Sequence, residues 1–376
     1  MPMPRAILVA AVGGYAAALL VTWASVFPVN DFAGFIAAGR ALPAGIDPYD
    51  PARWPDAYRS LGTQKPDTDV FGYPPWIAIA MLPFAPLPLV IGSLLWSGGG
   101  LALAMLGVAA VARRFDWGRP HPYLALAGLS WPTYLAFLQG QWSFLILALA
   151  CALLLDLDAR RDLRAGGWWA ALVLIKPQLF VIGSAALAIW AIATRRFRVV
   201  LAAAGTVIAA VAIATAVFPG WLGPWFQYVA AKRVVRSTQQ PTLAGLSGDV
   251  VGDLWPLVWV AAAVALGVVT ALTVRRVAPR QRLPVGLPMG LTVSIATALY
   301  SWSYDQYATL LCGCAAIALA RSRAIAIASF ALFGPLALAL FLSSYPRYHD
   351  TLAGLVPPLA IALLAYAATR ARAPAS

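Results

Sequence analysis

The sequence predicts an all-α protein that crosses a membrane many times, and three observations support this fold class. First, the 376 residues are 61% hydrophobic and only 11% charged, whereas a soluble domain carries about 25% charged residues. Second, apolar runs of about 20 residues, long enough to span a bilayer as helices, recur along the chain. Third, the basic residues form small clusters between these runs, as in cytoplasmic loops. We expect about ten to twelve crossings in a single membrane domain over residues 1–376.

The charge pattern argues against a nucleic-acid-binding protein, despite the formal net charge of +13. Basic residues dispersed between apolar runs orient membrane helices and do not form one continuous basic surface. All fourteen acidic residues are Asp, which marks loops, turns and sites. Cys151, Cys312 and Cys314 lie inside apolar runs without zinc-site spacing, so we interpret them as packing residues.

The first helix is expected over residues 6–28, and it is retained because it lacks the cleavage site of a signal peptide. The segment 29–75 that follows is polar and rich in Asp and Pro, which predicts an extracytoplasmic loop. Within it, apolar residues repeat at helical spacing over 32–42, so a short helix should lie on the membrane surface. Asp50-Pro51 predicts the cap and first-turn proline of a second helix that ends near Ser60.

The middle of the chain predicts shorter helices separated by polar breaks. Residues 76–112 should hold a short helix and a long one, and residues 121–138 a short apolar piece. A polar break over 139–142 then leads into a helix over 142–156. Two orientations of the basic segment 113–119 stay open. The positive-inside tendency places it in the cytoplasm, whereas two full crossings over 76–112 would place it outside.

The second half of the chain alternates apolar helices with polar or basic loops. Lys176 and Pro177 should interrupt the helix that starts at 166, because a proline disfavours helical geometry in the residue before it. Residues 219–253 predict a second extracytoplasmic loop, and the basic segment 195–198 predicts a cytoplasmic one. Further helices are expected over residues 178–194, 199–218, 254–274, 285–303, 307–320, 324–343 and 351–369.

With the basic loops placed inside, the unusual polar residues gather at the predicted outer ends of the helices. Polar groups at membrane depth are costly and usually line a functional cavity. The convergence of distant segments on one face therefore predicts a site there. The residues concerned are Asp31, the segment 45–73, Gln139, Gln141, Lys176, Asp305, His349 and Asp350.

Asp31 has two interpretations. It can be the N-cap of the short helix over 32–42, a role that contributes about 1 kcal/mol. Alternatively, its carboxylate is a general base that takes a proton from an acceptor hydroxyl at the membrane surface. Because a capping carboxylate is already hydrogen-bonded to the backbone, the two roles do not easily coincide.

Lys176 also has two interpretations. It lies about 15 Å along a helix from Gly166, and therefore deep in the membrane. Its long side chain can snorkel towards the surface. The alternative is that its ammonium group pairs with a lipid phosphate, because an anion entering the membrane edge needs a cation there.

The remaining polar residues are ambiguous in the same way. Asp350 can cap the last helix, or its neighbour His349 can contact a phosphate. Asp305, Gln139 and Gln141 can hydrogen-bond the hydroxyls of a sugar, or they can join helix ends in a structural network. Both interpretations stay open for each residue.

The chain resembles the bacterial GT-C glycosyltransferases that use polyprenyl-phosphate-linked sugars, specifically the polyprenyl-phosphate-mannose-dependent mannosyltransferases of glycosyltransferase family 87. The matching pieces occur in the order found in that family and span most of the chain. They are Asp31-Phe32, Gly45-Ile46-Asp47-Pro48-Tyr49, Tyr73-Pro74-Pro75, Gly140-Gln141, Lys176-Pro177-Gln178, Ser303-Tyr304-Asp305-Gln306 and His349-Asp350.

The resemblance implies a GT-C fold whose first outer loop packs over the membrane. It also implies that Asp31 is the catalytic aspartate and that Lys176 and His349 lie near the donor phosphate. We further expect Arg347 to help neutralise the phosphate as it departs. Asn30 stands where metal-dependent relatives often carry a second acidic residue, so we expect neither a metal nor another cofactor. The residues expected to bind sugar or acceptor are Asp47, Tyr73, Gln141, Gln178, Tyr304, Asp305, Gln306 and Asp350.

The predicted function is therefore inverting transfer of a sugar, mannose or another hexose, from a polyprenyl-phosphate donor to an extracytoplasmic lipid or glycan acceptor. The enzyme would lie in the bacterial plasma membrane, with its site on the outer face and with membrane lipids as its surroundings. The main alternative is a transporter or flippase of a lipid-linked sugar, which would use the same cations and aromatic residues. Transporters show repeated halves, and no internal repeat is evident here. A third interpretation is a non-catalytic assembly subunit.

Overall fold

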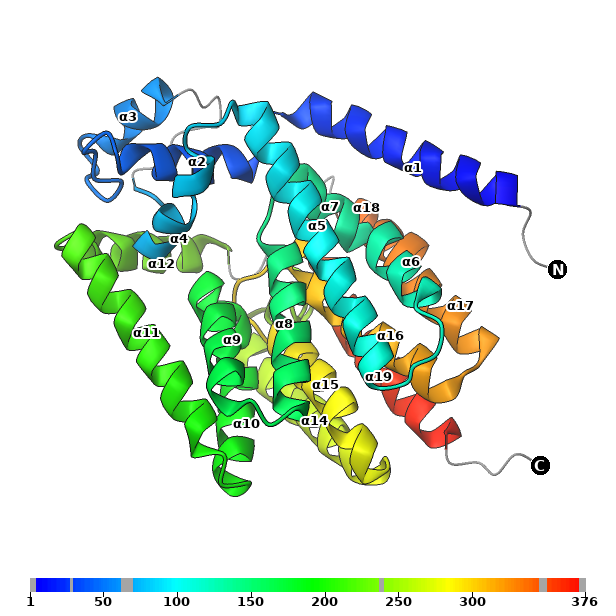
Figure 1. Ribbon diagram of the computed structural model, residues 1–376. Coiled ribbons are helices and arrows are strands. Elements are labelled where there is room, and N and C mark those ends of the chain that lie inside the picture. The colour runs from blue at the N-terminus through cyan, green and yellow to red at the C-terminus, as the bar shows by residue number, and fades with distance from the viewer. Residues whose placement is uncertain (1–4, 28–29, 62–69, 237–239, 345–349, 372–376) are drawn as a thin grey trace. The chain divides into compact units, whose positions relative to one another are not determined.

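Helices form all the regular secondary structure in the computed structural model, which describes residues 5–27, 30–61, 70–236, 240–344 and 350–371 (Figure 1). The α-helices are α1 (Arg5–Val26), α2 (Asp31–Ala41), α3 (Trp54–Ser60), α4 (Pro75–Ala80), α5 (Leu89–Arg114), α6 (His121–Leu129), α7 (Trp131–Gln139), α8 (Ser143–Asp158), α9 (Asp162–Ile175), α10 (Pro177–Ala193), α11 (Phe197–Val217), α12 (Leu222–Arg236), α13 (Leu243–Val251), α14 (Trp255–Arg276), α15 (Arg282–Ala296), α16 (Leu310–Ala320), α17 (Arg323–Ala331), α18 (Ala337–Ser344) and α19 (Val356–Arg370). Shorter helical turns are η1 (Leu82–Phe84), η2 (Gly252–Leu254), η3 (Pro279–Gln281), η4 (Ser303–Thr309), the π-helical η5 (Leu332–Leu336) and η7 (Thr351–Leu355).

The length and apolar character of the helices confirm an all-α integral membrane fold. Within the described ranges, five helical segments are long and apolar enough to cross a membrane. They are Leu89–Arg114, Phe197–Val217, Leu243–Arg276, Arg323–Ser344 and Thr351–Arg370. Helices such as α8 and α10 are shorter than the about 20 residues of a full crossing, so the total of about ten to twelve crossings stays a prediction.

The chain divides into two compact units. Unit 1 comprises residues 1–99, 134–141 and 213–229. Unit 2 comprises residues 100–133, 142–212 and 230–376.

Helix α2 is the centre of the packing in unit 1, where it contacts α3, α4 and η1. Its side chains Phe32, Phe35 and Ile36 are almost completely buried. Gly39 allows α4 to approach closely, because a Cβ atom at this position would lie 2.8 Å from the Cβ atom of Met81. The short helix predicted after the first long one is thus confirmed, and it is a core element of its unit.

A single arginine joins the end of α2 to two neighbouring segments. The guanidinium group of Arg40 donates hydrogen bonds to the carbonyl oxygens of Leu61, Ala85 and Leu87, at distances of 2.8–3.0 Å. These carbonyls follow the last turns of α3 and η1, where helix geometry leaves acceptors without partners. Arg40 therefore fixes the segments on either side of α2 to each other.

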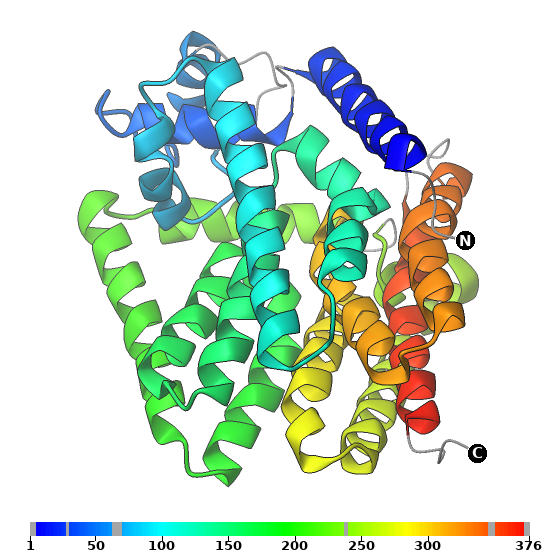
Figure 2. The ribbon, with the colours of Figure 1, turned by 45° about the vertical axis from the view of Figure 1, so that its right-hand side comes forward.

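Unit 2 is a bundle in which consecutive helices pack as antiparallel neighbours. Helix α8 packs against α9, and α10 packs against α15, which also contacts α14 and α19 (Figures 1 and 2). Cys151, Cys312 and Cys314 are free and buried, so the interpretation as packing residues is confirmed. The break predicted after residue 175 is also confirmed, because α9 ends at Ile175 and α10 begins at Pro177.

Several predicted boundaries are wrong for local reasons. Asp50 does not cap α3: its carboxylate accepts a hydrogen bond from the amide of Ala52, and its carbonyl accepts one from Trp54, where the helix begins. The segment 219–253 contains α12 and α13, and its extracytoplasmic position stays a prediction. Helix α15 ends at Ala296 instead of continuing to residue 303.

Candidate active site

Asp31 is the first residue of α2 in unit 1, and it is not the cap of this helix. The N-cap is Asn30, whose side-chain oxygen accepts a hydrogen bond from the amide of Ala33 at 3.4 Å. The capping interpretation of Asp31 is therefore wrong. Asp31 is an acidic residue in the first turn of α2, a position where a carboxylate interacts favourably with the helix dipole.

A tight turn from the end of α7 packs against the start of α2. Gly140 has φ of +61°, and a Cβ atom there would lie 2.6 Å from the Cβ atom of Phe32. Only glycine satisfies both the left-handed backbone and the close approach. Asn30 donates a hydrogen bond to the carbonyl of Leu138 at 3.2 Å, and Trp96 donates one to the carbonyl of Gly140 at 2.8 Å.

This turn places Gln141 against Asp31. The Gln141 side-chain amide donates a hydrogen bond to the Oδ2 atom of Asp31, although the two residues are 110 positions apart in the chain. Gln141 is 1% exposed, so its amide holds the carboxylate in one orientation. We call Asn30, Asp31, Gly140 and Gln141 the Asp31 cluster.

Asp47 and Tyr73 both lie in unit 1 and both have structural contacts. The carboxylate of Asp47 accepts a hydrogen bond from the amide of Tyr49 at 2.9 Å and so stabilises the turn before α3. The hydroxyl of Tyr49 in turn donates to the carbonyl of Tyr73. The ring of Tyr73 packs edge-on against Phe35 of α2, with a centroid distance of 5.0 Å. These contacts connect the loop segments to α2.

Lys176 in unit 2 is buried in an ion pair. Its ammonium group lies 2.6 Å from the Oδ1 atom of Asp305, and both side chains are at most 3% exposed. The ammonium also lies 4.8 Å from the ring centroid of Tyr304, a cation–π distance. The snorkelling interpretation is therefore wrong, because the charged end points into the unit and not towards solvent.

Asp350 lies close to this pair. Its Oδ2 atom accepts hydrogen bonds from the amide of Ser303 at 3.0 Å and from the hydroxyl of the same residue at 2.6 Å. Its Oδ1 atom has no hydrogen-bond partner among the described residues. Burial raises the pKa of the Asp350 carboxyl to about 6, the hydrogen bonds from Ser303 oppose this rise, and the negative charge of Asp305 adds to it. We call Lys176, Ser303, Tyr304, Asp305 and Asp350 the Lys176 cluster.

The proposed helix-capping role of Asp350 is also wrong. Asp350 precedes η7, but its side chain makes no capping hydrogen bond to that helix. The carboxylate turns instead to Ser303, 47 residues earlier in the chain. Asp350 therefore connects η4 to the segment before the last helix.

Two other predicted residues of unit 2 differ in burial. Gln306 is 1% exposed, and its amide donates hydrogen bonds to the carbonyls of Ala353 at 2.8 Å and Pro241 at 3.3 Å. Gln178 is half-buried in the first turn of α10. The predicted phosphate-binding residues Arg347 and His349 lie outside the described residues.

The structure brings in further residues with a positioning role. Asn30 had a usable signal in the sequence, because an Asn directly before a short amphipathic helix is a common N-cap. Ser303 and Gln240 carry no local signal, and their partners are distant in the chain. Gln240 is completely buried and accepts a hydrogen bond from the amide of Ser301 at 3.3 Å.

Across the part of the chain that the structure describes, no three His, Cys, Asp or Glu side chains gather as ligands. The residue next to Asp31 is Asn30, whose side-chain oxygen is engaged as a cap. The described residues of the Asp31 cluster thus offer a single carboxylate.

A family model for glycosyltransferase family 87 matches residues 71–301, more than half of the chain. The chain belongs to glycosyltransferase family 87. Family membership and the apolar helices together make it a membrane glycosyltransferase. Comparison with curated proteins and with solved structures gives no match. The region that matches family 87 includes Gln141 and Lys176, whereas Asp31, Asp305 and Asp350 lie outside it.

Proposed function

We propose that the protein transfers a hexose from a polyprenyl-phosphate-linked donor to a lipid or glycan acceptor on the outer face of a bacterial plasma membrane. The observation that carries this proposal is the hydrogen bond from Gln141 to the carboxylate of Asp31. It orients a single carboxylate at the start of α2 while Asn30 supplies the helix cap. A carboxylate that is held in one orientation and does not cap a helix has the properties of a general base.

In the proposed reaction Asp31 accepts the proton of the acceptor hydroxyl. The acceptor oxygen then forms a bond to the anomeric carbon, and the bond from that carbon to the phosphate oxygen breaks on the opposite face. The electron pair leaves with the polyprenyl phosphate, so the configuration at the anomeric carbon is inverted. Because phosphate is a good leaving group, no protein acid is required.

Lys176 is proposed to stabilise the phosphate as negative charge develops on it. Positive groups held in place in a water-poor environment stabilise such charge more strongly than they would in water. Asp305 and the ring of Tyr304 hold the ammonium group in position in the folded protein. Arg347 and His349 keep their predicted role as further phosphate contacts.

The remaining predicted residues are proposed to contact the sugar or the acceptor. They are Asp47, Tyr73, Gln141, Gln178, Tyr304, Asp305, Gln306 and Asp350. Mannose is the first sugar to test, because the resemblance is to mannosyltransferases. We propose that the reaction needs no metal, since Asp31 is flanked by Asn30, and we expect transfer to continue at the same rate in EDTA.

The test uses purified protein in proteoliposomes with radiolabelled polyprenyl-phosphate-mannose and a lipid extract as acceptor. We compare the wild type with Asp31→Asn and with Asp56→Asn, a control on α3 whose side chain is 84% exposed. Loss of a general base should lower turnover by a factor of about 10²–10⁴. Donor binding should stay within about twofold of the wild type, because the amide keeps the shape of the carboxylate.

The controls separate the possible failures. Equal turnover in the wild type and Asp31→Asn would remove Asp31 from the mechanism. A second outcome is that several lipid-linked sugars bind but none yields a glycosylated product. If the labelled donor then moves across the vesicle membrane, the protein is a transporter of the lipid-linked sugar. Reduced turnover in Asp56→Asn as well would mean that the assay reports general damage to unit 1.

A further inference from the structure

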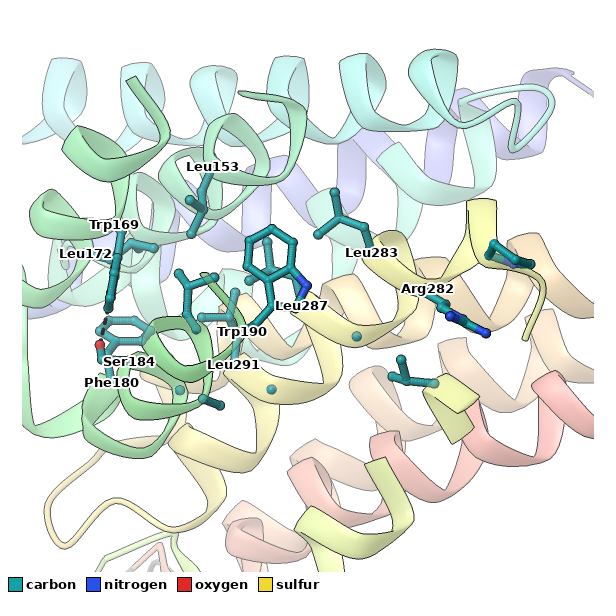
Figure 3. A pocket seen from close by; sticks show the side chains of 17 residues that line it. Leu153, Trp169, Leu172, Phe180, Ser184, Trp190, Arg282, Leu283, Leu287 and Leu291 are labelled. Atoms are coloured by element: carbon teal, nitrogen blue, oxygen red, sulfur yellow. Dashed lines mark hydrogen bonds between the residues drawn. The ribbon is translucent and has the colours of Figure 1, made fainter. Parts of the chain in front are cut away.

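An apolar cavity lies inside unit 2, apart from the Lys176 cluster. Its volume is about 520 Å³, and its walls come mainly from α9, α10 and α15. Cavities that bind small molecules measure about 300–1,000 Å³. Figure 3 shows leucine and tryptophan side chains along its length, including Trp190, Leu287 and Leu291.

Three glycines line the cavity wall, and one of them faces open space. They are Gly183 on α10 and Gly286 and Gly290 on α15. At Gly183 and Gly286 a Cβ atom would lie 3.2 Å from a neighbouring side chain, so these two allow close helix contacts. Gly286 and Gly290 are four residues apart, so they lie on one face of α15. A Cβ atom at Gly290 would meet no other atom within 4 Å, which means that this glycine leaves open space instead of allowing a close helix contact.

The two ends of the cavity differ in charge. Figure 3 shows Trp169, Phe180 and Ser184 at one end and Arg282 at the other. At the first end the indole of Trp169 donates a hydrogen bond to the hydroxyl of Ser184 at 2.9 Å, so that hydroxyl is already engaged. Arg282 is exposed, and it makes no ion pair with any described carboxylate. The cavity therefore has an apolar interior and a cation at one mouth.

The mouth at Arg282 belongs to an arginine-rich end of the bundle. Gly183, in the first half of α10, donates a hydrogen bond to Ser294 near the end of α15, whereas Trp190, in the last turn of α10, lies beside Leu287 earlier in α15 (Figure 3). The two helices therefore run antiparallel. The last turn of α10 therefore lies beside the first turn of α15. There the guanidinium group of Arg196 stacks on the ring of Trp190, which itself lines the cavity, at 5.1 Å.

We propose that this cavity binds one acyl chain of an anionic glycerophospholipid, with the lipid phosphate held by Arg282. The apolar walls match an acyl chain, and the cation at the mouth matches an anionic headgroup. Basic residues at a membrane surface attract anionic lipids, and the guanidinium group binds phosphate through two parallel hydrogen bonds. This binding site does not depend on the proposed catalytic roles of Asp31 and Lys176.

The polarity of the cavity favours a membrane phospholipid over the prenyl tail of the sugar donor. Lys176 directly precedes α10, whereas Trp190 lies in the last turn of that helix, about 21 Å further along its axis. Arg282, in the first turn of α15, lies at the same end of the cavity as the last turn of α10. Among the described residues that line the cavity, none near Phe180, at the end closest to Lys176, is charged. A donor whose phosphate lies at Lys176 would therefore leave Arg282 without an anionic partner.

Native mass spectrometry tests the proposal on the full chain. The protein is reconstituted with equal amounts of phosphatidylglycerol and phosphatidylcholine carrying identical acyl chains, then extracted and analysed for retained lipid. We expect about tenfold preference for phosphatidylglycerol in the wild type, lost in Arg282→Gln and kept in Arg282→Lys. Arg280→Gln changes an exposed arginine on η3 that does not line the cavity, and should behave as the wild type.

A second pair of variants tests the acyl-chain site itself. Gly290→Leu fills open space in the cavity and should abolish retention of both lipids, whereas Gly267→Leu makes the same change on an exposed face of α14 and should not. Equal retention of the two lipids, unchanged by Arg282→Gln, would overturn the proposal. Displacement of phosphatidylglycerol by an equal amount of polyprenyl phosphate would overturn it in favour of the donor tail.

Discussion

Two glycines of unit 1, Gly45 and Gly140, share a left-handed backbone but differ in their surroundings. Their φ angles are +65° and +61°. A Cβ atom at Gly45 would meet nothing within 4 Å, whereas one at Gly140 would lie 2.6 Å from the Cβ atom of Phe32. The two positions therefore require the same backbone conformation and differ in whether a side chain lies close to the glycine.

This comparison predicts different effects of the same substitution. Gly45→Ala should destabilise the protein by about 1–2 kcal/mol, the cost of a left-handed alanine. Gly140→Ala should cost clearly more, because Phe32 must move, and it should also lower sugar transfer by disturbing the contact between Gln141 and Asp31. Thermal unfolding in detergent and the transfer assay measure both effects. Equal destabilisation by the two variants would show that the contact with Phe32 is unimportant.

Asp350 is a buried carboxyl whose protonation should affect stability. Because burial raises its pKa to about 6 in the folded protein, the folded state binds this proton more tightly than the unfolded state. The free energy of unfolding should therefore fall as the pH rises from about 4 to about 6, by about 3 kcal/mol for this group. Above about pH 6 the protein no longer gains stability from the protonated Asp350 carboxyl.

The variant Asp350→Asn tests this pH dependence. Asparagine cannot ionise and can still accept the hydrogen bonds from Ser303. We expect the melting temperature of the variant to fall less between pH 5 and pH 7 than that of the wild type. Asp249→Asn changes an exposed carboxylate of α13 and is the control. Identical pH profiles for the wild type and Asp350→Asn would contradict a raised pKa at this site.

At the scale of elements, the pair between Lys176 and Asp305 joins the break between α9 and α10 to η4. Asp305 also accepts a hydrogen bond from the amide of Trp302 at 3.1 Å and so closes the first turn of η4. Lys176 has a non-helical backbone at the break, with φ of −146° and ψ of 79°. The pair therefore fixes two irregular segments that lack a continuous helix to hold them.

Removing one partner of this pair should be more harmful than removing both. Lys176→Met leaves a buried carboxylate without its cation, which costs about 3–5 kcal/mol. The double variant Lys176→Met with Asp305→Leu should recover most of this stability but not the transfer activity. The exposed pair of Arg59 and Asp56 is the control, because surface pairs contribute about 0–1 kcal/mol. A double variant as unstable as Lys176→Met would show that the buried charge is not the cause.

At the scale of the whole molecule, cysteine labelling tests the predicted orientation in the membrane. The three native cysteines are buried, so they should react little with a membrane-impermeant maleimide. We expect Asp56→Cys, in the predicted outer loop, to react in intact spheroplasts. Arg198→Cys should react only after permeabilisation, because the basic segment around it is predicted to be cytoplasmic. Labelling of Arg198→Cys from outside would reverse the predicted orientation.

The sequence by itself determined the class of the fold and most of its interruptions. Apolar runs specify membrane helices because an unpaired backbone is too costly in lipid, and this effect is read from composition alone. The break at Lys176 and the turn at Gly140 were also predictable, since proline and glycine act on the backbone next to them. The ordered set of short motifs further indicated the family.

Only the tertiary structure decided what the polar residues contact. Asp31 meets Gln141 across 110 positions, and Lys176 meets Asp305 across 129. A local pattern cannot reveal such partners, because each side chain has several plausible neighbours until the helices pack. Asn30, and not Asp31, caps α2, and Lys176 forms a buried ion pair instead of extending to the membrane surface. The reason is that a buried charge or donor without a partner costs more free energy than a local preference can supply.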